Sequence, residues 1–73
     1  MKGGEQMVKG LGEKIKALRK AKNISQEQLS KMCNVSRRTV INAETSKKIP
    51  TLSTLEKLAS GLDTTIDNLI TNN

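Results

Sequence analysis

Residues 25–44, SQEQLSKMCNVSRRTVINAE, predict two short helices joined by a tight turn, and this pair decides the fold. Ser25 and Gln28 form a capping box. The serine hydroxyl can accept a hydrogen bond from the Gln28 amide, and the glutamine side chain can reach back to the Ser25 amide. The first helix is therefore expected over about residues 26–32, with its Met32–Cys33 end buried.

The turn and the second helix are also predicted from a few neighbouring residues. Asn34 stands where the chain needs a left-handed residue, a conformation that asparagine tolerates better than other non-glycine residues. Ser36 can cap the second helix, which is expected over about residues 36–44. Two short helices joined in this way form a helix-turn-helix, a unit whose second helix enters the major groove of DNA.

The second helix divides into two faces when its residues are placed about 100° apart on a helical wheel. The outward face carries Arg37, Arg38, Ile41 and Asn42. The inward face carries Thr39, Val40 and Ala43. Arginine matches the O6 and N7 acceptors of guanine, asparagine matches the N6 and N7 edge of adenine, and an aliphatic group can contact a thymine methyl. The outward face is therefore predicted to read base edges.

Two alternatives remain open on this outward face. Arg37 and Arg38 could instead contact phosphates, or only keep the surface solvated. Ile41 could pack sideways against the scaffold rather than meet a thymine methyl. The four residues together, on the second helix of such a motif, favour base reading over either alternative.

The rest of the chain predicts an all-α bundle of five helices. A helix over about residues 11–21 precedes the motif. Thr51 can cap a helix that ends near Gly61, and Thr65 can cap a short last helix. We divide the chain into a flexible N-terminal arm at residues 1–10, a helix-turn-helix domain at residues 11–70 and a tail at residues 71–73.

The composition excludes several classes of protein. The chain of 73 residues has no histidine, so it lacks the base of a Ser–His or Cys–His pair, and we expect no enzyme. The single cysteine, Cys33, is interpreted as a small buried filler, with a redox-sensitive thiol as the alternative. We expect no metal, no cofactor and no small-molecule ligand. No segment predicts a signal peptide or a membrane span, so a cytoplasmic location is expected.

The net charge of +6 is unevenly distributed along the chain. Residues 1–48 hold twelve Lys and Arg against four Asp and Glu, whereas residues 49–73 hold one against three. No acidic residue lies between Glu27 and Glu44, the segment that contains both arginines of the outward face. A basic field on one side of a small domain favours a polyanionic partner, double-stranded DNA before a membrane surface.

Residues 11–70 resemble the Cro/cI-type helix-turn-helix family, often called XRE-like, of phage repressors and bacterial transcriptional regulators. The resemblance is carried by IKALR at 15–19, SQEQLS at 25–30, NVSRRTV at 34–40, Glu44, and Pro50 followed by LSTLEKLASGL at 52–62. It implies a five-helix, lambda-repressor-like DNA-binding bundle. It also implies a sequence-specific bacterial or phage regulator, commonly a repressor that binds a palindromic operator as a dimer.

The resemblance also implies roles for single residues. Gln26 matches a glutamine that contacts phosphate and braces the first side chain of the second motif helix. Arg19 and Glu44 match an ion pair that ties the first helix of the domain to the end of that helix. The alternative for Glu44 is a solvent-exposed side chain. The phosphate candidates are Gln26, Ser36, Thr39, Lys47 and Lys48.

The chain departs from the family pattern at three positions. Asn34 and Ser46 replace common glycines, and the second replacement could change the path of the loop that holds Lys47 and Lys48. Ala43 replaces a larger apolar residue. The space that it leaves is expected to be filled by Met32 or Ile49.

One helix-turn-helix reads only a few base pairs, so a second copy is expected to bind a second half-site. The stripe assigned to the core is Leu52, Leu55, Leu58, Ala59 and Leu62. The candidates for the contact between two copies are Ile66, Leu69 and Ile70. Two other functions stay open: an antitoxin that autoregulates through the same fold, and a protein-interaction module that does not bind DNA.

Overall fold

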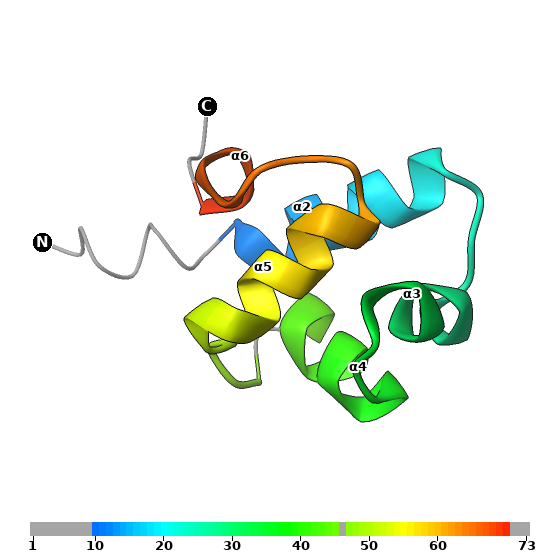
Figure 1. The fold of residues 1–73 in the computed structure, drawn as a ribbon, viewed down its shortest axis with the longest axis horizontal. Helices are drawn as coiled ribbons and strands as arrows, with labels where there is room; N and C mark the ends of the chain where they lie inside the picture. The colour runs from blue at the N-terminus through cyan, green and yellow to red at the C-terminus, as the bar shows by residue number, and fades with distance from the viewer. Residues whose placement is uncertain (1–9, 46, 71–73) are drawn as a thin grey trace, which may run out of the picture.

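The computed structural model describes residues 10–45 and 47–70, which are all-helical with connecting turns (Figure 1). The helices are α2 (Leu11–Ala21), α3 (Gln26–Cys33), α4 (Arg37–Thr45), α5 (Leu52–Gly61) and α6 (Ile66–Ile70). The predicted all-α class and the five helices are confirmed within this part of the chain. Of the predicted arm and tail, residues 1–9 and 71–73 lie outside the described residues.

The capping box at the start of α3 is formed as the sequence predicted. Ser25 Oγ accepts a hydrogen bond from the Gln28 amide at 3.0 Å, and the Ser25 amide donates to Gln28 Oε1 at 2.8 Å. Asn34 ends the helix in the left-handed region, at φ 58° and ψ 44°. The turn between the two motif helices therefore depends on one residue that tolerates positive φ.

Hydroxyl caps also start the three helices that follow. The capping residues are Ser36, Thr51 and Thr65, whose side chains accept hydrogen bonds from amides three residues further on. Each cap satisfies one amide that the helix itself leaves without a partner. Because these interactions are local, the starts of the helices follow directly from the sequence.

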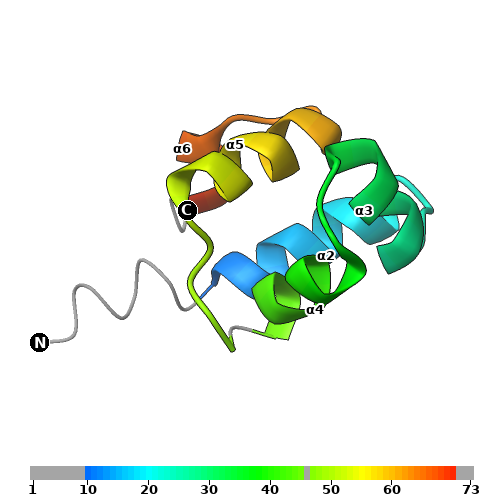
Figure 2. The ribbon, with the colours of Figure 1, turned by 60° about the horizontal axis from the view of Figure 1, so that its bottom comes forward.

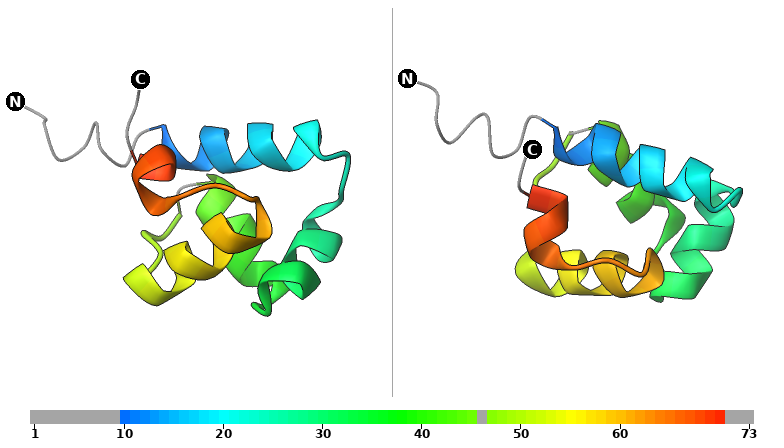
Figure 3. Two further views of the ribbon diagram at one scale, coloured as in Figure 1. Left: turned by 45° about the horizontal axis from the view of Figure 1, so that its top comes forward. Right: turned by 90° about the horizontal axis from the view of Figure 1, so that it is seen from above.

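The helices enclose one aliphatic core, and α4 packs against both α2 and α3. The most deeply buried large side chains of this core are Ile15, Leu29, Val40, Leu58 and Leu69. α2 runs along one side of the molecule with α6 beside its N-terminal end (Figure 3). The outer surface of α4 is left uncovered, with the segment at residues 47–51 rising beside it to α5 (Figure 2).

Gly12 allows α2 to approach the end of α4 closely. A Cβ atom at this position would meet the backbone carbonyl oxygens of Ala43 and Glu44. Backbone atoms cannot rotate away as a side chain can, so any larger residue would push the two helices apart. The glycine thus sets how closely α2 and the end of α4 can approach each other.

Three expectations about apolar residues are wrong. Met32 is 53% exposed and Leu52 is 64% exposed, although both were assigned to the interior. Ile49 is 69% exposed, so neither Met32 nor Ile49 fills the space beside Ala43. Ala43 instead lines an open hollow together with Asn42, Lys48 and Pro50.

Candidate nucleic-acid interface

The predicted division of α4 into two faces is present in the structure. Val40 and Ala43 are buried in the core. Arg37 and Arg38 are exposed, while Ile41 and Asn42 are half-buried on the outward side. The half-burial of Ile41 leaves part of its side chain accessible, so both interpretations of this residue persist.

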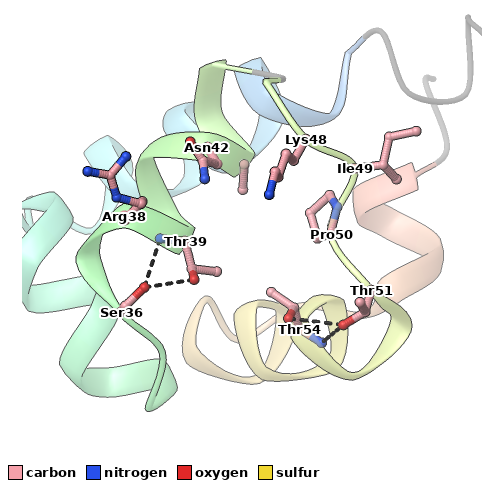
Figure 4. A pocket seen from close by; sticks show the side chains of 10 residues that line it. Ser36, Arg38, Thr39, Asn42, Lys48, Ile49, Pro50, Thr51 and Thr54 are labelled. Atoms are coloured by element: carbon pink, nitrogen blue, oxygen red, sulfur yellow. Dashed lines mark hydrogen bonds between the residues drawn. The ribbon is translucent and has the colours of Figure 1, made fainter.

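A shallow hollow flanks α4 on either side of its outward face. One hollow is lined by Arg37, Arg38 and Ile41. The other lies between α4 and the start of α5, and its lining includes Arg38, Asn42 and Lys48 (Figure 4). Among the residues that the structure describes, no acidic residue lines either hollow. Arg38 borders both, so it stands at the centre of the surface that a DNA groove would meet.

Ser36 and Thr39 hold each other at the start of α4. Ser36 Oγ accepts from the Thr39 amide at 3.0 Å, and the two hydroxyl oxygens lie 2.8 Å apart in a hydrogen bond (Figure 4). One of the two hydroxyl protons is used in that bond. With the pair intact, only the other proton is left to donate to a phosphate.

Glu44 joins three helices at the inner end of the motif. Its carboxylate is buried and accepts hydrogen bonds from Arg19 Nε at 2.6 Å and from Arg19 Nη2 at 3.2 Å. Arg19 Nη1 also donates to the Ile24 carbonyl oxygen at 2.9 Å, which fixes the turn between α2 and α3. Glu44 is not solvent-exposed. Its charge is paired inside the domain instead of opposing the basic face.

The bracing contact of Gln26 goes to a different partner from the expected one, and its phosphate contact stays a prediction. The Gln26 amide nitrogen donates to Glu44 Oε1 at 3.1 Å, so the bracing contact goes to the end of α4 and not to the first side chain of that helix. Since a carboxylate only accepts hydrogen bonds, this contact fixes which way the Gln26 amide faces. Gln26 is half-buried.

Lys47 and Lys48 follow α4, and both are exposed. Lys48 lines the hollow beside Asn42 and extends towards it (Figure 4). The Lys47 amide donates to the Asn42 carbonyl oxygen at 3.1 Å, which ties the start of this segment to the helix. Ser46, where the chain departs from the family pattern, lies outside the described residues.

The predicted dimer candidates are a partial error. Leu69 is only 2% exposed and belongs to the core of a single chain, so its side chain is not available to a second copy. Ile66 and Ile70 are half-buried and pack against the same core. The exposed aliphatic residues lie elsewhere, at Ile49 and Leu52.

Cys33 is buried between α3 and α5, close to Gly61. Burial raises the pKa of its thiol, and the hydrogen bond with the Gly61 backbone opposes this rise only in part. A buried thiol that resists ionisation is a poor nucleophile. This environment is that of an apolar filler.

A family comparison identifies the chain. The model of the helix-turn-helix family matches residues 15–69, which include every described helix apart from the first turn of α2 and the last residue of α6. The chain belongs to the helix-turn-helix family. The predicted resemblance to Cro/cI-type proteins is thereby confirmed. This helix-turn-helix family consists of DNA-binding proteins, so the prediction that the chain is not an enzyme is also confirmed.

Three relatives share the helix-turn-helix region. The chain is 35% identical over 60 residues to the immunity repressor protein of Bacillus phage phi105. It is 36% identical over 58 residues to the HTH-type transcriptional activator BcrR of Enterococcus faecalis, and 36% identical over 61 residues to the control protein C.SmaI of Serratia marcescens. The matches cover 82%, 80% and 84% of this chain. They cover 42%, 28% and 73% of the respective relatives, so the chain spans less than half of the first two.

No solved structure gives a significant match to this helix-turn-helix chain. None of its described helices is long and apolar enough to span a membrane.

Proposed function

We propose that this chain is a transcriptional regulator that binds double-stranded DNA at a specific sequence. We further propose that it represses transcription and binds a palindromic operator as a homodimer. The observation that carries the proposal is the outward face of α4, where Arg37, Arg38, Ile41 and Asn42 lie together. Within residues 10–45 and 47–70, the hollows on both sides of this face are lined by no acidic residue that would repel DNA.

Each part of this surface has a proposed role. Arg38 and Asn42 would read base edges, because their hydrogen-bonding groups match guanine and adenine in the major groove. Arg37 and Ile41 would extend that contact on the opposite side of α4. Lys47 and Lys48 would hold the phosphate backbone, with Gln26, Ser36 and Thr39 as further phosphate contacts at the start of the two motif helices.

Repression needs no activity beyond DNA binding, because a domain bound to DNA excludes other proteins from the same site. The name of the phage phi105 relative, an immunity repressor, supports this choice. Its phage origin and the bacterial origins of the other two relatives support action in the bacterial cytoplasm, where such DNA is found.

Selection of binding sites from random duplex DNA tests the proposal. The wild-type chain is expected to enrich an inverted repeat whose half-site centres lie about one helical turn, roughly 34 Å, apart. The variant carrying both Arg38→Ala and Asn42→Ala should enrich no motif, while Lys57→Ala on the exposed surface of α5 should enrich the wild-type motif. A wild-type chain that enriches no sequence would refute the proposal.

A further inference from the structure

The hollow between α4 and the start of α5 is lined by two kinds of side chain. Arg38, Asn42 and Lys48 are polar and are the proposed contacts to bases and phosphate. Thr39 and Ala43 line the same hollow from α4, and they add methyl groups to its surface. The volume of the hollow is about 340 Å³, which leaves room for the edge of one base. The hollow therefore combines hydrogen-bonding groups with an apolar surface.

Hydrogen bonds at the start of α4 fix which part of Thr39 faces this hollow. The hydroxyls of Thr39 and Ser36 are bonded to each other at 2.8 Å, and Ser36 Oγ also accepts from the Thr39 amide at 3.0 Å. Figure 4 shows the Thr39 hydroxyl turned towards Ser36 and the methyl carbon on the other side, towards the hollow. Asn42 follows Thr39 by three positions, so the two side chains are neighbours on the helix surface. Thr39 thus presents an apolar group beside a proposed base-reading amide.

The rest of the hollow keeps this apolar surface open. Ala43 is 2% exposed and its side chain ends at Cβ, so it does not extend into the space beside Thr39. Pro50 adds a further apolar side chain to the lining. On the side of α5, the hydroxyl proton of Thr51 is used in a hydrogen bond to the Thr54 hydroxyl at 3.1 Å. An apolar group of a ligand can therefore enter next to the Thr39 methyl.

We propose that Thr39 is a specificity-determining residue whose methyl group contacts the C5-methyl group of a thymine. The inference rests on the proposed function, since it requires α4 to lie in the major groove. The thymine methyl is the apolar group that unmodified base pairs present in that groove. In an A·T pair it lies on the same edge as the adenine N6 and N7 groups that Asn42 would read. A thymine at or next to the pair read by Asn42 is therefore the partner of Thr39.

This role differs from the two roles already assigned nearby. The Thr39 hydroxyl stays with Ser36, where that pair can still donate to a phosphate, because the methyl and the hydroxyl point to different sides (Figure 4). Ile41, the earlier candidate for a thymine contact, lines the other hollow with Arg37 and Arg38. Thr39 and Ile41 would therefore select different thymines.

Replacement of single thymines by uracil in the selected duplex tests the inference, because uracil lacks only the C5-methyl group. Binding of the full chain to each duplex is measured for wild type, Thr39→Ser and Thr39→Val. Serine keeps the hydroxyl and removes the methyl, whereas valine keeps a methyl and removes the hydroxyl. Ile41→Ala probes the other hollow, and Lys57→Ala on the exposed surface of α5 is the control. Circular dichroism melting confirms that each variant is folded.

We expect wild type to bind thymine about fourfold more tightly than uracil at one position of each half-site, which is the contribution of burying one such carbon group. Thr39→Ser should bind both duplexes equally at that position. Thr39→Val, Ile41→Ala and Lys57→Ala should keep the fourfold preference there.

Three results would overturn the inference: a selected site with no thymine that wild type prefers over uracil, a preference that persists in Thr39→Ser, or a preference at the same position that is lost in Thr39→Val or Ile41→Ala. A wild-type chain that selects no sequence at all would instead refute the proposed function.

Discussion

Replacing Glu44 with alanine is expected to lower the free energy of unfolding by about 3 kcal/mol. The Glu44 side chain is 2% exposed, and its carboxylate accepts hydrogen bonds from Arg19 Nε, Arg19 Nη2 and Gln26 Nε2. Removing one partner of a buried ion pair costs roughly 3–5 kcal/mol, because the other charge is left buried without compensation. Arg19 keeps its hydrogen bond to the Ile24 carbonyl oxygen, which places the loss at the lower end of that range.

Urea unfolding followed by circular dichroism measures this loss. A domain of this size has a total stability of roughly 3–9 kcal/mol, so the variant should unfold at a much lower urea concentration, and the titration is best started in the cold. The matched control is Lys22→Ala, which removes a solvent-exposed ion pair of the same length, 2.6 Å, to Asp63. Because water screens that pair, its loss should cost less than about 1 kcal/mol.

A double variant separates the ion pair from general packing. Arg19→Met combined with Glu44→Leu replaces both charges by apolar groups, an exchange that is often nearly neutral. The double variant should therefore be more stable than Glu44→Ala alone. The reasoning is refuted if Glu44→Ala costs no more than Lys22→Ala. It is also refuted if the double variant loses as much stability as Arg19→Met and Glu44→Leu lose together when each is measured alone.

Three further substitutions address the fold and the DNA-facing surface. Gly12→Ala should lower the free energy of unfolding by roughly 1–3 kcal/mol in urea titrations, because the new methyl group would meet the carbonyl oxygens of Ala43 and Glu44. Alanine normally stabilises a helix relative to glycine, so the loss would come from this clash and not from helix preference. A variant as stable as wild type would contradict the expectation. Asn34→Ala should lower the stability of the domain by about 1–2 kcal/mol in thermal melting, because φ is 58° at this position and alanine is strained there. Asn34→Gly should change the stability very little, because glycine adopts positive φ freely. Equal melting temperatures for the two variants would argue against backbone strain at this position. Lys48→Ala should weaken binding to selected and scrambled DNA equally, and it should reduce the slope of log affinity against log salt concentration by about 0.9. A loss confined to the selected site would exclude a phosphate contact by Lys48.

The helix starts could be predicted because each depends on contacts within four residues. Ser25, Ser36 and Thr51 cap the helices that their positions in the sequence indicated. Asn34 adopts the left-handed conformation that the turn required. The two faces of α4 could be predicted from sequence spacing alone, because residues three positions apart, such as Val40 and Ala43, lie on the same face of an α-helix.

Which apolar residues are covered could not be predicted from spacing. Met32 and Leu52 have the periodicity of core residues, but no neighbouring element reaches them. Leu69 shows the reverse error, since its short helix docks on the core and leaves it no free face. These outcomes depend on how the helices pack, and packing involves residues far apart in the sequence.

The polar contacts of the site also include some that could be predicted and some that could not. The meeting of Arg19 with Glu44, 25 residues apart, was implied by the family resemblance and not by any local pattern. The hydrogen bond from Gln26 to Glu44 was not predicted. The role of Gly12 was missed as well, although a glycine in the first turn of a helix, where it weakens the helix, is a signal of close backbone approach.

The specificity ratio of Arg38→Ala tests most directly the central claim that α4 reads base edges. The ratio compares binding to the selected site with binding to a scrambled duplex of equal length, at the same salt concentration, for wild type and variant. Loss of a bidentate base contact costs about 1–3 kcal/mol, so the ratio should fall by roughly 5- to 150-fold while scrambled-site binding changes little. If Arg38→Ala weakens binding to both duplexes equally and leaves the ratio unchanged, Arg38 only holds phosphates and the account of this surface is wrong.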